Sequence, residues 1–308
     1  MSIEIEPIAA GLQRDERRPA PQPRMSFRKW LRELGWRHLV GIAVGLFAIF
    51  PLLYVLSASL NPSGSLTGSN VLFRTIAFDN YVTLFTDPNR PYGAWFANTM
   101  LVGIVTSLAT VFLGALAAYS FSRMRFTGRR AGLLSLVLVQ MFPQMLAIVA
   151  IYILMRGISD VFPAIGLDSQ IGLILVYLGG ALGVNTYLMY GFFNTVPASI
   201  DEAAKIDGAG HARIFFTIIL RLVAPILAVV GLLSFIGTAS EFLIASVILQ
   251  SPEKLTLAVG LYRLISDENN ANFPLFAAGA VLAAIPVMVL FLWLQKYIVG
   301  GLTAGAVK

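Results

Sequence analysis

The chain has 308 residues and a formal net charge of +6 at pH 7; 57% of its residues are hydrophobic and only 12% are charged. Soluble domains carry about 25% charged residues, so this composition excludes an ordinary soluble protein and indicates a polytopic membrane protein. Cysteine is absent, which excludes disulfides and thiol chemistry. His38 and His211 have no second ligand at metal-site spacing, so no metal site is expected.

Residues 1–36 hold several prolines and many charges, and we expect them to form a disordered basic cytoplasmic tail. This stretch lacks the short apolar core and cleavage site of a secretory signal, so the first apolar segment should remain in the membrane as an anchor. Six apolar segments follow, each about 20 residues long and able to cross a hydrocarbon core ~30 Å thick as a helix. They cover residues 38–58, 98–121, 131–155, 170–192, 217–239 and 275–298. The expected fold is therefore an all-α polytopic membrane protein with six transmembrane helices.

Lysine and arginine set the expected orientation of these spans. Seventeen of the 22 lie in the N-terminal tail, in the second and fourth connections, or at the C-terminal end. Only five lie in the first, third and fifth connections. Because cytoplasmic loops carry the excess of basic residues, this distribution predicts that both termini are cytoplasmic. It also accounts for the positive net charge, so no nucleic-acid partner is expected.

The chain carries no visible energy source for transport. None of its five lysines is preceded by glycine or followed by serine or threonine, so the sequence contains no P-loop and we do not expect an enzyme. The centres of the spans are almost free of the ionisable residues that proton and sodium carriers use. If this protein drives transport, the energy must come from a partner.

The fourth connection contains the charged, alanine-rich segment "SIDEAAKIDGAG", residues 199–210. Ser199 and Glu202 have capping-box spacing, and Gly208 suits a helix C-terminus because glycine adopts the left-handed conformation at little cost. The segment therefore predicts a helix of about two turns over residues 200–207. Spacing alone leaves two interpretations open: a helix that lies on the membrane surface, or a helix that docks onto another protein.

This segment resembles the cytoplasmic signature of bacterial ABC-importer permeases, EAA-x3-G-x9-I-x-L-P. The chain matches it at Glu202, Ala203, Ala204, Gly208, Ile218 and Leu220, but Arg221 replaces the final proline, which puts the turn geometry there in question. Residues 140–155, 161–180, 256–262 and 301–308 are also similar to MalG-type subunits of maltose/maltodextrin importers. The likeness covers most of the chain after about residue 38. It implies a type I ABC importer permease-like domain over residues 37–300, with the EAA coupling loop at about 197–221.

The resemblance also implies partners and functional residues. The expected partners are a MalF-like companion permease, a MalK-like ATPase dimer that binds ATP and Mg, an extracytoplasmic sugar-binding protein that touches the segment around 250–262, and membrane lipid. No cofactor is expected on this chain, and the location would be the bacterial cell membrane. ATPase coupling would involve Ser199, Asp201, Glu202, Ala203, Ala204, Asp207 and Gly208. The C-terminal tail, residues 301–308, would contact the ATPase through Gly301, Leu302 and Thr303. Gln140, Asn185 and Tyr187 could line the translocation path, although neutral polar residues in spans commonly bond neighbouring helices instead.

Several alternatives remain at this point. The substrate could be maltose, maltodextrin or a related oligosaccharide such as trehalose, and a permease for a different solute would carry the same coupling segment. A self-sufficient secondary carrier would show charges within its spans or inverted repeats. An integral membrane enzyme would show convergent acids, bases or metal ligands. The sequence displays none of these last features.

Overall fold

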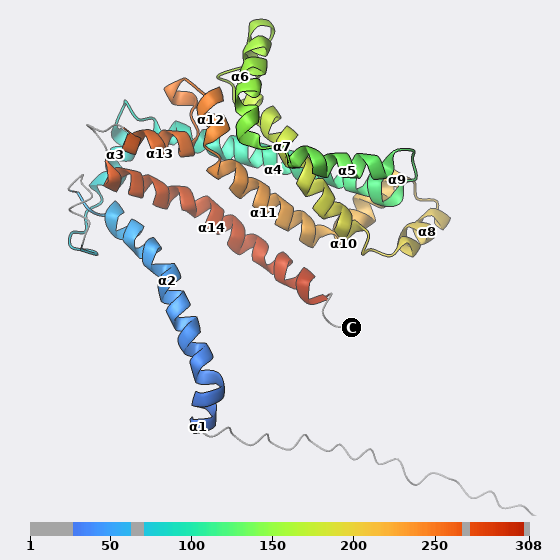
Figure 1. The fold of residues 1–308 in the computed structure, drawn as a ribbon, viewed down its shortest axis with the longest axis horizontal. Coiled ribbons are helices and arrows are strands. Elements are labelled where there is room, and N and C mark those ends of the chain that lie inside the picture. The colour runs from blue at the N-terminus through green and yellow to red at the C-terminus, as the bar shows by residue number, and fades with distance from the viewer. Residues whose placement is uncertain (1–26, 63–70, 267–271, 305–308) are drawn as a thin grey trace, which may run out of the picture. The chain divides into compact units, whose positions relative to one another are not determined.

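The computed structural model describes residues 27–62, 71–266 and 272–304 (Figure 1). All the secondary-structure elements within these ranges are helices, in agreement with the predicted all-α class. The chain divides into two units, Met1–Leu52 and Leu53–Lys308, and the boundary between them falls inside α2.

The first unit is helical from its first described residue. It contains α1 (Phe27–Trp30), the π-helical turn η1 (Leu31–Gly35) and most of α2 (Trp36–Ser59). The last ten residues of the predicted disordered tail are thus helical, because Phe27, Trp30 and Leu31 recur at helical spacing and extend the apolar pattern of α2 backwards. Residues 1–26 of that tail lie outside the described residues. The apolar side chains of α2 are exposed along most of its length, as expected for a helix that meets lipid or another membrane helix.

The second unit holds the remaining elements. These are the end of α2, then α3 (Asp79–Thr86), α4 (Tyr92–Arg123), α5 (Arg129–Gln140), α6 (Gln144–Val161), η3 (Pro163–Ile165), α7 (Gln170–Phe193), α8 (Ala198–Ile206), α9 (His211–Arg213), η4 (Ile214–Ile219), α10 (Leu220–Leu222), α11 (Ala224–Ser240), α12 (Leu243–Ile248), η5 (Pro252–Lys254), α13 (Leu257–Ser266) and α14 (Phe273–Ala304). The backbone of α14 continues into the predicted C-terminal tail, since Gly301, Leu302 and Thr303 are helical. The side chains of these three residues lie outside the described part of the structure.

Four of the six predicted spans are continuous helices, and two are broken. The continuous ones are Arg28–Ser59, Tyr92–Arg123, Gln170–Phe193 and Phe273–Tyr297. The predicted span 131–155 is instead the pair α5 and α6, bent by 99°, and the span 217–239 is bent by 78° between α10 and α11. Pro143 and Pro225 lie at the two breaks, where proline lacks an N–H and its ring clashes with the carbonyl of the preceding turn. The described residues therefore contain four helices that are long and apolar enough to cross a membrane, or up to six such spans if each bent pair counts as one.

Two hydrophobic clusters hold the second unit together, and α4 and α7 contribute to both. The first cluster joins the beginnings of α4, α7 and α14 with α12 and α13, through residues such as Trp95, Leu173, Ile248, Leu257 and Leu275. The second joins the ends of α4 and α7 to α8, η4 and α11, through Met189, Phe193, Ile214 and Val230. α11 packs on α4 and α14 (Figure 1).

Candidate functional site

The loop between α7 and α11 begins with α8, which differs at its start from the prediction. Pro197 precedes the helix, and its carbonyl oxygen accepts a hydrogen bond from the Ile200 N–H at 3.2 Å. Ser199 therefore lies within the first turn, and no side chain caps the helix. The predicted capping box is wrong because Pro197, in an extended conformation, starts the helix before Ser199.

The prediction that Gly208 ends the helix is confirmed. This residue has a φ of +79°, in the left-handed region where an L side chain is strained. The Gly208 N–H donates to the Lys205 carbonyl at 3.0 Å, and the Ala209 N–H donates to the Ala204 carbonyl at 2.9 Å. These two bonds form a Schellman motif, which satisfies the last carbonyls of the helix and turns the chain sharply.

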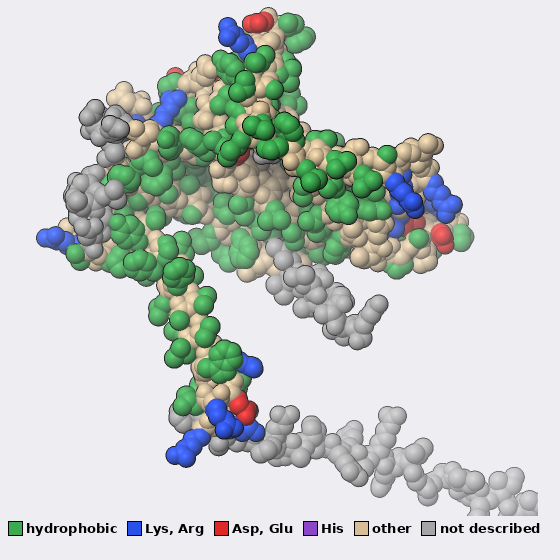
Figure 2. All heavy atoms as spheres, viewed as in Figure 1, with side chains coloured by type: hydrophobic (Ala, Val, Ile, Leu, Met, Phe, Trp, Pro, Cys, Tyr) green, Lys and Arg blue, Asp and Glu red, His purple; other side chains and the backbone are tan. Residues whose placement is uncertain are grey.

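One face of α8 packs inward and the other is open. Asp201 and Ala204 are buried, whereas Glu202, Lys205 and Ile206 are exposed. The Ile206 side chain is 87% exposed, which is unusual for a large apolar residue at the end of a charged helix. Lys and Arg side chains also gather at the end of the second unit that carries α8 and α9 (Figure 2). The open face thus offers an apolar contact surrounded by charges.

An ion pair fixes α8 to the end of α4. Arg123 Nε lies 3.0 Å from Asp201 Oδ2, and the two side chains are 10% and 8% exposed. Arg123 also donates from Nη2 to the Val196 carbonyl at 2.8 Å, so one guanidinium holds both the start of the loop and its helix. Asp201, predicted as an ATPase-coupling residue, therefore faces the body of its own chain and positions the open face of α8.

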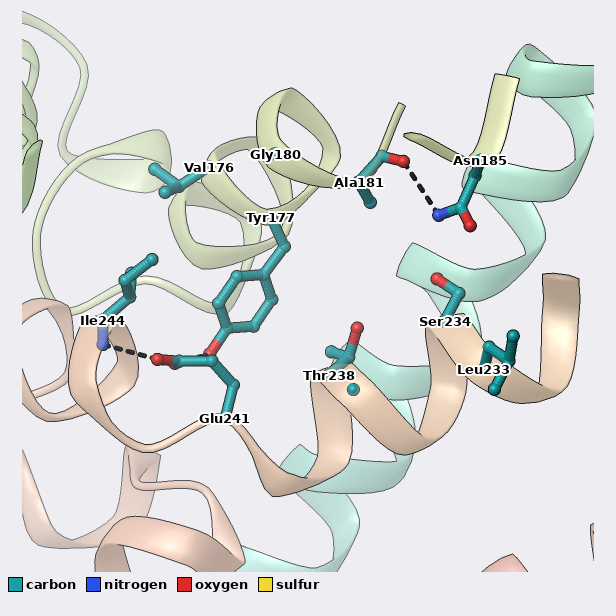
Figure 3. A pocket seen from close by; sticks show the side chains of 11 residues that line it. Val176, Tyr177, Gly180, Ala181, Asn185, Leu233, Ser234, Thr238, Glu241 and Ile244 are labelled. Atoms are coloured by element: carbon teal, nitrogen blue, oxygen red, sulfur yellow. Dashed lines mark hydrogen bonds between the residues drawn. The ribbon is translucent and has the colours of Figure 1, made fainter. Parts of the chain in front are cut away.

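A hollow of about 270 Å³ lies between α7 and α11 (Figure 3). At one end, the Tyr177 hydroxyl donates to Glu241 Oε2 at 2.5 Å. The Ile244 N–H donates to Glu241 Oε1 at 2.8 Å, and the Ala245 N–H donates to Glu241 Oε2 at 3.0 Å. Neither Tyr177 nor Glu241 was predicted as a site residue, although an ionisable side chain at the end of a predicted span is itself a signal of function.

The three residues predicted to line a path do not share one site. Asn185 lines the hollow, and its Nδ2 donates to the Ala181 carbonyl of the same helix at 2.8 Å. Gln140 lines a neighbouring hollow of about 410 Å³ and donates from Nε2 to the Gly180 carbonyl. The two hollows share Val176, Gly180 and Ile244. Tyr187 is 53% exposed and instead packs its ring near that of Tyr190.

Comparison with known proteins identifies the family. Residues 110–303 match the family described as "Binding-protein-dependent transport system inner membrane component". The chain belongs to this family. The galactooligosaccharides transport system permease protein GanQ of Bacillus subtilis is 40% identical over 285 residues, covering 92% of this chain and 98% of GanQ. The maltodextrin transport system permease protein MdxG of the same species is 42% identical over 260 residues, covering 84% and 91%.

Further comparisons confirm the resemblance of this permease to the MalG type. The maltose/maltodextrin transport system permease protein MalG of Yersinia pestis is 38% identical over 289 residues, covering 90% of this chain and 94% of that protein. Among solved structures, a chain of a bacterial ABC transporter involved in the import of the acidic polysaccharide alginate superposes with a TM-score of 0.72 at 27% identity. The match covers 89% of this chain and 99% of that one. This permease is therefore a multi-pass membrane protein with the fold of an ABC-transporter permease.

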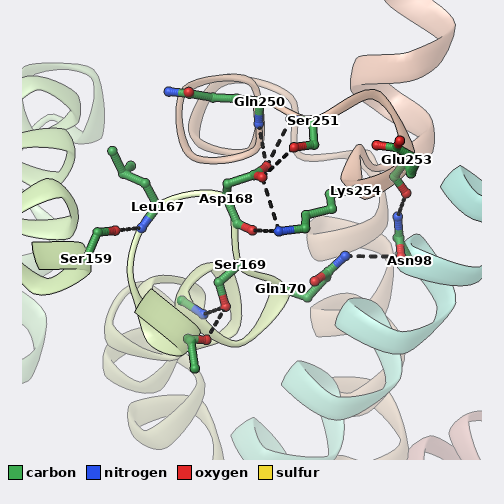
Figure 4. A network of polar contacts seen from close by, with 12 residues as sticks. Asn98, Ser159, Leu167, Asp168, Ser169, Gln170, Gln250, Ser251, Glu253 and Lys254 are labelled. Atoms are coloured by element: carbon green, nitrogen blue, oxygen red, sulfur yellow. Dashed lines mark hydrogen bonds and ion pairs between the residues drawn. The ribbon is translucent and has the colours of Figure 1, made fainter. Parts of the chain in front are cut away.

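Just before the start of α7, the end of this helix away from α8, Asp168 ties together two loops (Figure 4). Its carboxylate accepts hydrogen bonds from the Gln250 N–H at 2.9 Å, the Ser251 N–H at 3.0 Å and the Ser251 hydroxyl at 2.5 Å. It also pairs with Lys254 Nζ at 3.1 Å. Burial alone would raise the pKa of the Asp168 carboxyl, but the hydrogen bonds from Ser251, Gln250 and Lys254 outweigh it and lower the pKa to about 2. The carboxylate thus anchors the start of the segment 250–262.

Proposed function

We propose that this permease forms half of the translocation path of an ATP-driven oligosaccharide importer. The observation that carries the proposal is α8: a short helix closed by Gly208, held from behind by the buried Arg123–Asp201 pair and open on its Ile206 side. A rigid helix with one free face suits the transmission of movement from another protein. On this view, Glu202, Ala203 and Lys205 surround the contact with a separate ATPase pair, which binds ATP and Mg.

The proposed mechanism is alternating access. A binding protein delivers sugar at the end that carries the Asp168 network, and closure of the ATPase pair moves α8 together with the end of α4 and the second hydrophobic cluster. The helices of the permease then exchange an inward-facing for an outward-facing arrangement, jointly with a companion permease. This assigns α8 and both termini to the cytoplasmic side, with Gly301, Leu302 and Thr303 near the ATPase. The excess of lysine and arginine on that side supports the orientation.

The names of the curated relatives support a substrate class. GanQ, MdxG and MalG are named for galactooligosaccharides, maltodextrin and maltose/maltodextrin, which are all neutral sugars. We therefore propose a neutral oligosaccharide, and trehalose belongs to the set to be tested.

The test begins with gentle purification of the chain from its native membrane and mass spectrometry of the proteins that accompany it. We expect a second permease and an ATPase in about two copies. ATP hydrolysis by this complex should then rise when a loaded sugar-binding protein is added. Recovery of the chain alone, or as a homo-oligomer without an ATPase, would contradict the proposal and favour a self-sufficient carrier.

A further inference from the structure

The hollow between α7 and α11 contains hydrogen-bonding capacity that the surrounding structure does not use. The Ser234 side chain is only 8% exposed, and its Oγ has no hydrogen-bond partner among the residues described. Asn185 and Ser234 face the same space, with Thr238 one turn along α11 (Figure 3). An unpaired buried hydroxyl costs free energy, and a polar occupant of the hollow would supply the partner that the Ser234 hydroxyl lacks.

Glu241 gives the hollow a fixed acceptor. Its two carboxylate oxygens are held by two backbone N–H groups and by the Tyr177 hydroxyl, so the group cannot swing away. An ionised carboxylate offers about four lone-pair sites, and these three donors leave capacity for another. The Tyr177 ring lies beside it as a flat apolar wall (Figure 3).

The side chains that line the hollow suit a neutral sugar unit. A sugar unit presents hydroxyls, which both donate and accept, on the edge of a ring whose faces are apolar. Ser234, Thr238 and Asn185 match the hydroxyls, and Tyr177 matches a ring face. The lining contains a carboxylate and no basic side chain, so an acidic sugar unit would meet like charge without a counter-ion. Ligand sites usually measure roughly 300–1,000 Å³, so this hollow suits one sugar unit and not a chain.

We propose that this hollow is a subsite of the translocation path that takes one unit of a neutral oligosaccharide and disfavours uronic acid units. This inference rests on the proposed function and deepens it by assigning sugar contacts to this chain. Ser234, Thr238 and Asn185 bond the sugar hydroxyls, and Glu241 accepts from one hydroxyl and repels carboxylates.

Gly237 offers a direct test by filling the hollow. It lines the hollow on α11, and a Cβ built there meets no atom within 4 Å, so larger side chains fit without distorting the helix. The complete importer, in lipid vesicles with its binding protein, is assayed for ATP-driven uptake of maltotriose and of a galactose trisaccharide. Gly237→Leu should lower uptake of the transported sugar by about tenfold, while Gly237→Ala, the matched control, should stay near the unaltered protein.

Removal of the Ser234 and Thr238 hydroxyls should lower the affinity for the sugar. Ser234→Ala with Thr238→Val should raise the KM for uptake roughly fivefold per lost bond. Ser240→Ala is the control, because Ser240 lies on the same helix outside this hollow and bonds its own helix at the Ile236 carbonyl, at 2.7 Å. Glu241→Gln should reduce the discrimination between maltotriose and a triuronate of equal length. Normal transport by Gly237→Leu in a complex that imports sugar would overturn the subsite alone, whereas a complete complex that imports neither sugar would overturn the proposed function and the subsite together.

Discussion

The buried ion pair between Arg123 and Asp201 should determine how firmly α8 is held. Two unit charges 3.0 Å apart attract by about 5.5 kcal/mol at an effective dielectric constant of ~20. Desolvation of both groups offsets much of this gain, but removal of one partner leaves the other buried and unpaired, which costs about 3–5 kcal/mol. We therefore expect Asp201→Asn and Arg123→Met each to loosen α8 by several kcal/mol. The double variant should cost less than the sum, because it leaves no buried charge.

Amide hydrogen exchange on the purified permease measures this loosening directly. A loss of about 3 kcal/mol lowers the protection of the α8 amides by roughly a hundredfold, within the limit set by their initial stability. α13 provides an internal control, since it lies in the first hydrophobic cluster, at the other end of α4, and should keep its protection. The double-mutant cycle should give a coupling free energy of about 2 kcal/mol or more. Additive effects within about 0.5 kcal/mol would refute the inference that this pair holds the helix.

Three further predictions concern other parts of the permease. Gly208→Ala should destabilise the end of α8 by about 1–2 kcal/mol, because its φ of +79° is strained for an L residue. Gly208→Trp should abolish sugar uptake, while ATP hydrolysis and membrane insertion persist. Normal sugar uptake by Gly208→Trp would count against the docking role of α8. The Asp168 carboxyl, with its pKa lowered from 3.8 to about 2, contributes stability that is present above pH 3.8 and is lost as the pH falls through about 2. In the unaltered protein, the protection of the 250–254 amides from hydrogen exchange should fall over the same pH range. In Asp168→Asn, this protection should be low and should not depend on pH over that range. Gly260→Ala should destabilise the first hydrophobic cluster by about 1–3 kcal/mol, since its Cβ would come 2.3 Å from the Trp95 ring. Thermal unfolding measures this loss of stability. The control is Gly93→Ala, whose Cβ meets nothing within 4 Å.

Features that depend on neighbouring residues in the chain were predictable. The apolar segments located the four continuous spans, and Gly208 ended α8 because only local backbone geometry is involved. Pro143 and Pro225 were visible inside the other two spans, but a proline in a membrane helix can produce a mild kink or a complete break. Which of these occurs depends on packing around the helix, so the bends of 99° and 78° were not predictable from the sequence.

Features that depend on distant parts of the chain were missed. Asp201 lies 78 positions after its partner Arg123, so its inward orientation could not be read from the pattern of the EAA segment. Tyr177 and Glu241 are 64 positions apart and meet only because α7 and α11 enclose the hollow together. The Ser199 capping box failed for a local reason, since Pro197 already starts the helix. The spacing of Ser199 and Glu202 suggested a side-chain cap, but Pro197, two residues earlier, is the signal that starts the helix.

The central claim, that the open face of α8 docks onto a separate ATPase, can be tested by crosslinking in native membranes. The chain contains no cysteine, so a single Ile206→Cys substitution provides one reactive thiol on the exposed face of the helix. Ala204→Cys, on the buried face, is the matched control. We predict that the thiol at 206, and not at 204, forms a crosslinked product with an ATPase subunit, and that ATP alters its yield. A freely reactive thiol at 206 that yields no protein adduct in a transport-competent complex would contradict the claim.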